Sequence, residues 1–254
     1  MEDNAAMERN NKRPRRKKRN HSRKPGKAYN RAVEMVEAEK MYDINEACEL
    51  VKKVSFVKFD ASIDMHIRLG VDPRQANENI RGTASLPHGT GKKVTVLVLT
   101  TSDKEQEAKD AGADMVGLDE YIEKIKGGWT DVDVIVCSPD VMPKVGALGR
   151  ILGPRGLMPN PKSGTVTPNV GKAVEEVKAG KIDFRVDKAG IIHTPVGKSS
   201  FSAEQLKDNA VELLQTLHRM KPSGLKGVYF KGISLAPTMG PGVGVDKSSV
   251  DGIN

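Results

Sequence analysis

The stretch ASIDMHIRL, residues 61–69, decides how the two ends of this chain fold. Its apolar and polar residues alternate without exception: Ala61, Ile63, Met65, Ile67 and Leu69 against Ser62, Asp64, His66 and Arg68. Successive side chains of a β-strand point to opposite faces of the sheet, so this period of two predicts a strand that packs on one face. The other face of the strand is polar.

Helix and strand patterns of the same style surround this strand. Residues 29–40 have helical spacing, and Asp43 followed by Glu46 predicts a capping box that opens a second helix. After residue 180, a second alternating segment is followed by the turn DKAG at 187–190 and a return strand, which is most simply a hairpin. Ser202 and Gln205 then open an amphipathic helix before a last strand at 228–235. The two ends together supply four predicted strands.

The middle of the chain has a different pattern. Val94–Leu99 is an apolar run interrupted only by Thr95, typical of a parallel strand covered on both faces, and two helical segments follow it. A second predicted buried strand, Val132–Cys137, then leads to a helix near 169–178. This order of strand, helix, helix and strand predicts an inserted α/β domain. Linkers near 89–91 and 179–181 would join it to the rest in a geometry that permits hinge motion.

The net charge of +8 is concentrated at the N-terminus. Of the 41 basic and 33 acidic residues, residues 1–27 hold 11 and 3, so the rest of the chain carries 30 of each. A basic tail attracts phosphates without reading sequence, so specific recognition has to come from the neutral body. We predict that residues 1–27 are a disordered extension, with stable RNA contact as the alternative.

Cysteine usage and hydropathy bear on location. Cys48 and Cys137 lie far apart, which favours reduced core thiols in a cytosolic protein. The longest apolar run, Val94–Leu99, is far shorter than the roughly 20 residues that cross a bilayer, and residues 1–27 lack the apolar core of a secretory signal. We expect a cytoplasmic protein with no membrane partner.

The sequence gives little support for catalysis. Gly91-Lys92 and Gly197-Lys198-Ser199 resemble the end of a phosphate-binding loop, but the glycine required five residues earlier is replaced by Leu86 and Ile192. The five histidines are dispersed, without metal-ligand spacing. We expect no catalytic residue, no metal and no cofactor. With 4% aromatic residues, folded RNA read through its backbone and shape fits better than single strands stacked on aromatic rings.

The segment LGPRGLMPNPKSGTVTPNV, residues 152–170, closely resembles the signature of the universal large-subunit ribosomal protein L-one family, the proteins of the ribosomal stalk. Five other segments resemble the bacterial form of that family in the same order: YDINEA at 42–47, KFDASID at 58–64, RGTASLPHGTGK at 81–92, GIIHTPVGK at 190–198 and APTMGPGVGVD at 236–246. The resemblance covers residues 28–254.

This resemblance implies a mixed α/β (α+β) fold. A discontinuous, split β-α-β RNA-binding domain would comprise residues 28–89 plus 181–254, and an inserted three-layer, Rossmann-like α/β domain would comprise residues 90–180. It also implies a non-catalytic structural constituent of the large subunit, a monomer within the ribosome. Its partners would be large-subunit rRNA in the mobile stalk, the deacylated tRNA whose release from the exit site it assists, and the leader of its own operon mRNA, whose translation it would repress.

Carried over by position, the family's RNA contacts fall on the first of these domains. They are Lys58, Phe59, Ser62, Asp187, Lys188, His193, Thr238, Met239 and Gly240. Several have structural alternatives: Phe59 as a packed aromatic residue, His193 as the partner of a neighbouring strand, Asp187 as the residue that orients a turn, and 238–240 as a flexible loop. Gly232 and Pro237 depart from the polar residues frequent in relatives.

Two other functions stay open at this point. The strand and helix order of the middle segment is compatible with a nucleotide-dependent α/β enzyme, although a phosphate-binding loop is missing. The basic tail is compatible with a non-specific, charge-driven nucleic-acid binder. Tight binding of a nucleotide would favour the first function, and loss of all RNA binding on removal of the tail would favour the second.

Overall fold

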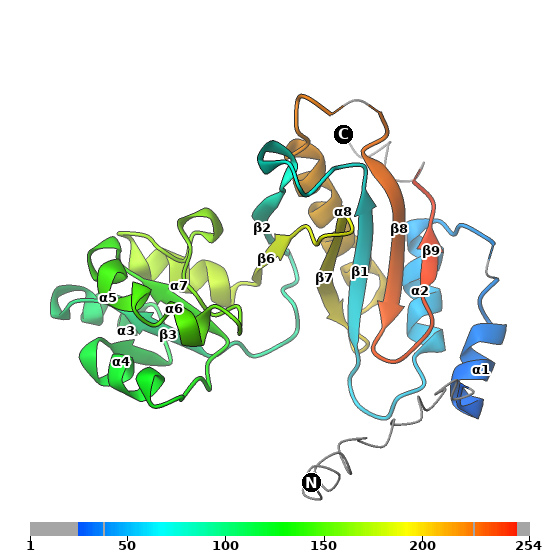
Figure 1. Cartoon of the computed structure of the whole chain (residues 1–254). Helices are drawn as coiled ribbons and strands as arrows, with labels where there is room; N and C mark the ends of the chain where they lie inside the picture. The colour runs from blue at the N-terminus through cyan, green and yellow to red at the C-terminus, as the bar shows by residue number, and fades with distance from the viewer. Residues whose placement is uncertain (1–24, 38, 226, 248–254) are drawn as a thin grey trace, which may run out of the picture.

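The computed structural model describes residues 25–37, 39–225 and 227–247 (Figure 1). Most of the predicted basic extension, residues 1–27, lies outside these described residues. Its last residue, Lys27, already begins helix α1 (Lys27–Glu34). This helix ends six residues before Lys40, so the prediction of a helix over 29–40 was too long, and Val33 on it is exposed.

A four-stranded antiparallel sheet in the order β7-β1-β8-β9 joins segments from both ends of the chain (Figure 1). Its strands are β1 (Ser62–Leu69), β7 (Ile191–Lys198), β8 (Phe230–Pro237) and β9 (Val243–Val245). The alternation predicted for β1 is confirmed, because Ile63, Met65, Ile67 and Leu69 are all buried. β1 pairs with β7 on one side and with β8 on the other.

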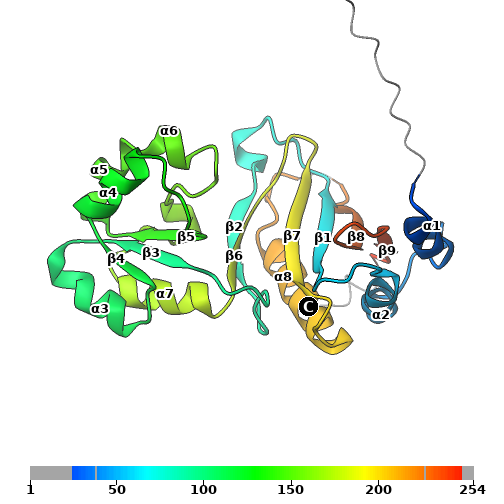
Figure 2. The ribbon, with the colours of Figure 1, turned by 90° about the horizontal axis from the view of Figure 1, so that it is seen from below.

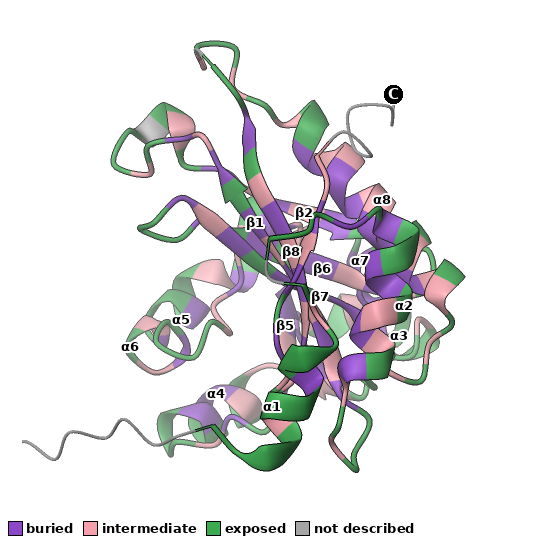
Figure 3. Cartoon of the chain, turned by 90° about the vertical axis from the view of Figure 1, so that its right-hand side faces the viewer, coloured by how far each residue is buried: buried purple, intermediate pink, exposed green. Residues whose placement is uncertain are grey.

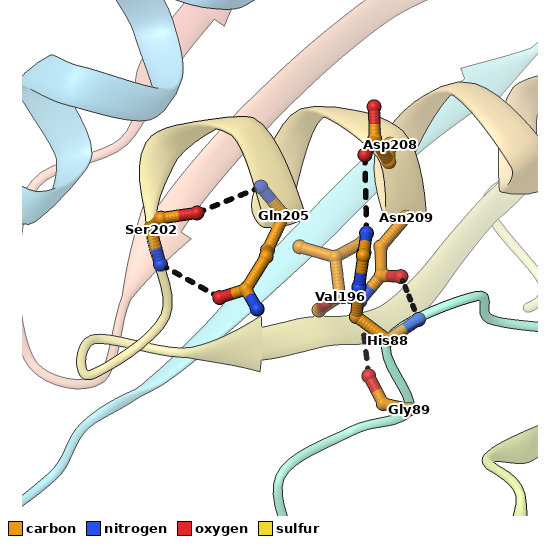
Figure 4. Close-up of polar contacts among 7 residues, drawn as sticks. All are labelled: His88, Gly89, Val196, Ser202, Gln205, Asp208 and Asn209. Carbon is orange, nitrogen blue, oxygen red and sulfur yellow. Dashed lines mark hydrogen bonds and ion pairs between the residues drawn. The ribbon is translucent and has the colours of Figure 1, made fainter.

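Two helices cover the buried face of this sheet, α2 (Ile44–Val54) and α8 (Ala203–Arg219), as Figure 2 shows. Asp43 caps α2 by accepting a hydrogen bond from Asn45 N at 3.1 Å, two residues on and not three as a capping box would require. The predicted capping box of α8 is confirmed, since Ser202 and Gln205 exchange both hydrogen bonds (Figure 4).

The predicted hairpin after residue 180 is wrong. β6 (Lys181–Arg185) pairs with β2 (Arg81–Ser85) in a separate two-stranded sheet, whereas the next strand, β7, pairs with β1. Only a turn connects β6 and β7, closed by hydrogen bonds between Asp187 and Ile191. Strand β2 was not predicted because its sequence, RGTAS, buries only a glycine and an alanine. Strand β9 lies in a segment that composition described only as glycine-rich.

The middle segment forms a parallel sheet in the order β4-β3-β5. Its strands are β3 (Val96–Leu99), β4 (Met115–Gly117) and β5 (Val134–Cys137). Both predicted buried strands are present, but β4 lies between two helices that sequence reasoning placed in direct succession. Only three residues long and half-buried, β4 has too little apolar pattern to be recognised.

Helices cover both faces of this parallel sheet. Alternate residues of β3 divide between two cores: Leu97 and Leu99 pack into one, and Val96 and Val98 pack into the other. The first core is closed by α4 (Asp119–Lys126), α5 (Met142–Gly146) and α6 (Gly149–Leu152), and the second by α3 (Glu105–Asp110) and α7 (Val170–Lys178). The short 3-10 helices are η1 (Ala76–Glu78), η2 (Ser102–Lys104), η3 (Pro139–Val141) and η4 (Pro161–Ser163). The mixed α/β class is therefore confirmed.

The two chain segments that lead into and out of the middle cross at a pair of glycines. Both Gly89 and Gly180 have positive φ, and a Cβ atom on Gly180 would collide with the backbone of Gly89. The buried side chain of Asn209 on α8 ties this crossing to the four-stranded sheet (Figure 4). It accepts from His88 N at 3.0 Å and donates to Gly89 O at 2.9 Å and Val196 O at 2.8 Å.

We predict that Asn209→Ala lowers the free energy of unfolding by about 3 kcal/mol, because three hydrogen bonds of about 1 kcal/mol each are lost in a buried site. Urea unfolding measures this change. The neighbouring Asp208→Ala, which removes only a solvent-exposed contact with His88, should cost less than about 1 kcal/mol. Equal losses in the two variants would contradict a role for Asn209 as the anchor.

Candidate nucleic-acid interface

The nine residues predicted to contact RNA lie along the exposed side of the four-stranded sheet, but not in one cluster. Lys58, Phe59 and Ser62 precede or begin β1, and Thr238–Gly240 follow directly on β8, whose last residue pairs with Ile63. These six residues share one end of the sheet. The turn that holds Asp187 and Lys188 lies at the opposite end, where Leu69 N donates to Gly190 O at 2.8 Å. His193 lies between the two ends.

Backbone hydrogen bonds fix the first end of the sheet. Thr238 N donates to Ser62 O at 2.9 Å, while Ser62 N donates to the Thr238 hydroxyl at 3.1 Å. That hydroxyl in turn donates to Ser62 O at 3.1 Å. Thr238 therefore locks the loop after β8 onto the start of β1, and the segment is a built turn.

Met239 is presented outward by this turn in an unusual conformation. Its φ is 64°, which makes it the only non-glycine residue with positive φ in the described part of the chain. A left-handed conformation costs a residue with a side chain about 1–2 kcal/mol. The side chain is nevertheless 71% exposed, so packing of the side chain does not repay this cost, and Phe59 beside the same end is 54% exposed. Met239 therefore combines a strained backbone with an exposed side chain.

Gly240 has a purely internal reason to be glycine. A Cβ atom there would lie 2.5 Å from Cγ of Pro237, and Gly240 N donates to Pro237 O at 2.9 Å. Pro237 thus closes the turn from within.

Lys198 and Asp60 also belong to this end of the sheet, although sequence reasoning missed both. Lys198 Nζ donates to the Ser62 hydroxyl at 2.9 Å. Desolvation of Asp60 is outweighed by hydrogen bonds from Ser199 and Ser200 and by the charge of Lys198, which together hold the pKa of its carboxyl below the ordinary value. The sequence GKSS at 197–200 contains the lysine and the two serines of this cluster, although as a motif it resembles only an incomplete phosphate-binding loop.

A pair of histidines occupies the middle of the exposed face. His66 of β1 and His193 of β7 are directly opposite each other, with their Nδ1 atoms 2.9 Å apart. The Asp187 carboxylate lies 3.6 Å from Nε2 of His193. Burial, followed by the nearby His193, lowers the pKa of His66 although Asp64 opposes the shift. Hydrogen bonds from the backbone of Ile191 and Ala189 lower the pKa of Asp187, so this carboxylate orients the turn.

Small residues on β8 leave this face accessible. Gly232, Ser234 and Ala236 lie opposite Arg68, His66 and Asp64 of β1, and none of them is large enough to cover its partner. With a rise of about 3.3 Å per residue, the seven steps of β1 extend the polar face over roughly 23 Å. Figure 3 shows this face on the side away from α2 and α8.

Arg81 and Arg185 form a second missed feature, on the two-stranded sheet. They are directly opposite each other across β2 and β6. Like charges at this spacing disfavour strand pairing. Nε of Arg81 is also buried without a hydrogen-bond partner in the described ranges. Neither guanidinium group forms an ion pair with an acidic side chain among the described residues.

Metal-binding clusters, cysteines and membrane-spanning helices are the remaining features that bear on function. Among residues 25–37, 39–225 and 227–247, no group of three or more His, Cys, Asp or Glu side chains could hold a metal ion. Cys48 and Cys137 are free and buried, as predicted, and burial raises the pKa of their thiols to about 12 and about 11. No helix of the described segments is long and apolar enough to cross a membrane.

An open polar sheet face, a strained and exposed methionine at one of its ends, and two like-charged arginines on the neighbouring sheet are features expected of a nucleic-acid-binding class of protein. The chain belongs to the Ribosomal protein L1p/L10e family, whose model matches residues 51–241. The family resemblance inferred from the sequence motifs is thereby confirmed.

Similar curated proteins support the same assignment. The Large ribosomal subunit protein uL1 of Bacteroides thetaiotaomicron is 64% identical over 222 residues, which are 87% of this chain and 96% of that protein. The protein of the same name from Bacteroides fragilis is 63% identical over 222 residues, with the same coverage. That of Porphyromonas gingivalis is 61% identical over 220 residues, 87% of this chain and 95% of that protein.

We predict that acidification from pH 7.5 to 5.5 destabilises the wild-type protein more than His66→Gln. The folded pKa of His66 is lowered, so its contribution to stability is complete above the unfolded pKa of about 6.5 and is lost as pH falls. Thermal unfolding at several pH values measures the difference, and parallel curves for the two proteins would contradict it.

Proposed function

We propose that this protein is a structural constituent of the large ribosomal subunit that binds large-subunit rRNA in the mobile stalk next to the exit site. The observation that carries the proposal is Met239, which is held in a strained conformation and exposed at the same end of the sheet at which β1 begins. The names of the relatives support the ribosomal setting. Those names denote structural proteins, so the enzyme alternative has no support from the comparisons.

The division of labour within the chain is part of this proposal. Residues 28–89 plus 181–254 form the discontinuous RNA-binding domain, and residues 90–180 form the inserted domain. The joint core of α2, α8 and strands from both chain ends supports this division, as does the glycine crossing at Gly89 and Gly180. The protein acts as a cytoplasmic monomer within the ribosome.

Each site residue has a role in this proposal. Lys58 and Lys188, near opposite ends of the face, contact phosphates, and Lys198 adds a third cation. Phe59 and Met239 pack against the sugar and base surface of a folded RNA, and Thr238, Gly240 and Ser62 build the turn that presents them. His193 donates to the RNA backbone, while Asp187 positions the turn and His193 without touching phosphate.

Two further partners follow from the family resemblance. We propose that the exit-site tRNA contacts the protein through Arg81 and Arg185, whose unpaired like charges call for an anion. We also propose that the leader of its own operon mRNA mimics the rRNA site and occupies the same sheet face, so that binding represses translation. The two RNAs would then compete for the surface around Met239.

We predict that Met239→Asp weakens binding to full-length large-subunit rRNA by at least tenfold, because a carboxylate is brought against phosphates. Met239→Gly is the matched control for charge and strain. It should also weaken binding, by a smaller factor, while raising the free energy of unfolding by about 0.5 kcal/mol through relief of the left-handed conformation. Filter binding and urea unfolding measure the two quantities.

The same variants distinguish the binding partners. Met239→Asp should weaken binding of the mRNA leader and of rRNA in parallel if the two share the face. Wild-type affinity of Met239→Asp for rRNA would place the RNA site elsewhere and overturn the proposal.

We predict that deletion of residues 1–27 makes the salt dependence of rRNA binding shallower but preserves the site preference. The deletion removes 11 basic residues, whose attraction to phosphates does not depend on sequence. Binding titrations between 50 and 200 mM salt, together with a footprint of the bound RNA, measure both properties. If all binding disappears, the charge-driven alternative is correct.

A further inference from the structure

A second cationic surface lies in the middle of the chain, away from the sheet face. Residues 141–172 contain no aspartate or glutamate, whereas the rest of residues 90–180 has 13 acidic and 7 basic residues. The acid-free stretch covers α5, α6 and the loop up to the start of α7. Its five basic residues are Lys144, Arg150, Arg155, Lys162 and Lys172.

Three of these five cations are exposed and have no ion pair within the described part of the chain. Lys144 is already in an ion pair with Asp119 at 3.1 Å, and Lys172 belongs to α7 on the opposite layer of the parallel sheet. Arg150, Arg155 and Lys162 are exposed, and their side chains have no hydrogen bond or ion pair to another described residue. Arg150 lies in α6, and Arg155 lies in the turn that follows this helix.

Two glycines just before Arg150 in the sequence have no internal explanation. Gly146 and Gly149 lie in α5 and α6 with helical backbone, and a Cβ atom on either would meet nothing within 4 Å. Alanine would fit both positions and would favour the helix. The contrast with Gly240, which is required by Pro237, shows that the fold alone does not demand these glycines. A bare backbone does, however, let a sugar-phosphate chain approach closely.

This surface faces the same way as the proposed RNA site. Figures 2 and 3 both show α5 and α6 on the side of the molecule where the four-stranded sheet is open. Helices α2, α8, α3 and α7 all lie on the other side. One RNA molecule bound to the sheet face can therefore reach both surfaces.

We propose that Arg150, Arg155 and Lys162, with the bare backbone at Gly146 and Gly149, form a second RNA-binding surface on the middle segment. It holds the phosphate backbone of the same large-subunit rRNA that the sheet face binds, without reading sequence. This inference rests on the proposed function for the identity of the RNA. Its contacts are additional to those around Met239.

The test is hydroxyl-radical footprinting of the full chain on large-subunit rRNA purified from Bacteroides thetaiotaomicron. The wild type should protect a segment that is lost in Met239→Asp and a second segment that is lost in R150Q/R155Q/K162Q. The triple variant should bind about tenfold more weakly, since each exposed ion pair contributes a factor of roughly two to three. Its plot of log affinity against log salt should be shallower by about two to three, as for three phosphate contacts.

Matched controls separate a defined surface from general charge. K104Q/K109Q/K172Q makes the same change in net charge on the α3 and α7 layer, and it should retain both protected segments. G146A/G149A leaves the charge unchanged, and it should lose the second segment while its thermal midpoint rises.

The outcomes are distinguishable. If the second segment survives in R150Q/R155Q/K162Q, or if the α3 and α7 control weakens binding equally, the second surface is overturned while the sheet site stands. If a parallel footprint on tRNA shows that the triple variant loses protection of tRNA but not of rRNA, the surface binds tRNA and the proposed rRNA partner is wrong. If the wild type protects no defined rRNA site, the proposed function itself fails.

Discussion

The alternation of β1 is the constraint on which the rest of the structure depends. β1 pairs with β7 and β8 at once, so its register fixes which residues of three strands face the core. A slip of one residue would expose Ile63, Met65 and Ile67 and bury His66 and Arg68. The same constraint that closes the hydrophobic core therefore also sets out the polar face, and the core and the candidate interface are two consequences of one pattern.

Sequence predicted the elements whose signal is local. β1, β3 and β5 and the cap of α8 were predicted because their alternation, apolar runs or capping residues are complete within a few positions. β2, β4 and β9 were missed because strands of three to five residues rich in glycine and small side chains have little pattern of their own. The hairpin failed for a different reason: the partner of β6 is β2, which lies about a hundred residues upstream.

The candidate site shows the same division between local and long-range information. The resemblance to a family supplied Ser62 and Thr238–Gly240, and the structure joins Ser62 to Thr238 through hydrogen bonds across 176 residues. Nothing local could have placed Lys198 beside Ser62, His66 opposite His193, or Arg81 opposite Arg185. These residues become candidates only when strand pairing brings their charges together. Their identity was visible in the sequence, but their proximity was not.

Charge and glycine are informative here only through their positions. The excess charge of the chain belongs to its first 27 residues, yet the cations expected to hold RNA lie on a body that is neutral as a whole. Because acidic and basic residues of the body are equal in number, most of its cations can have an acidic partner, as Lys144 has in Asp119. The few cations without such a partner are therefore informative. In the same way, Gly240 and Gly180 are required by close contacts inside the protein, whereas Gly146 and Gly149 are not. What distinguishes an interface residue from a structural one is therefore whether the fold itself already accounts for it.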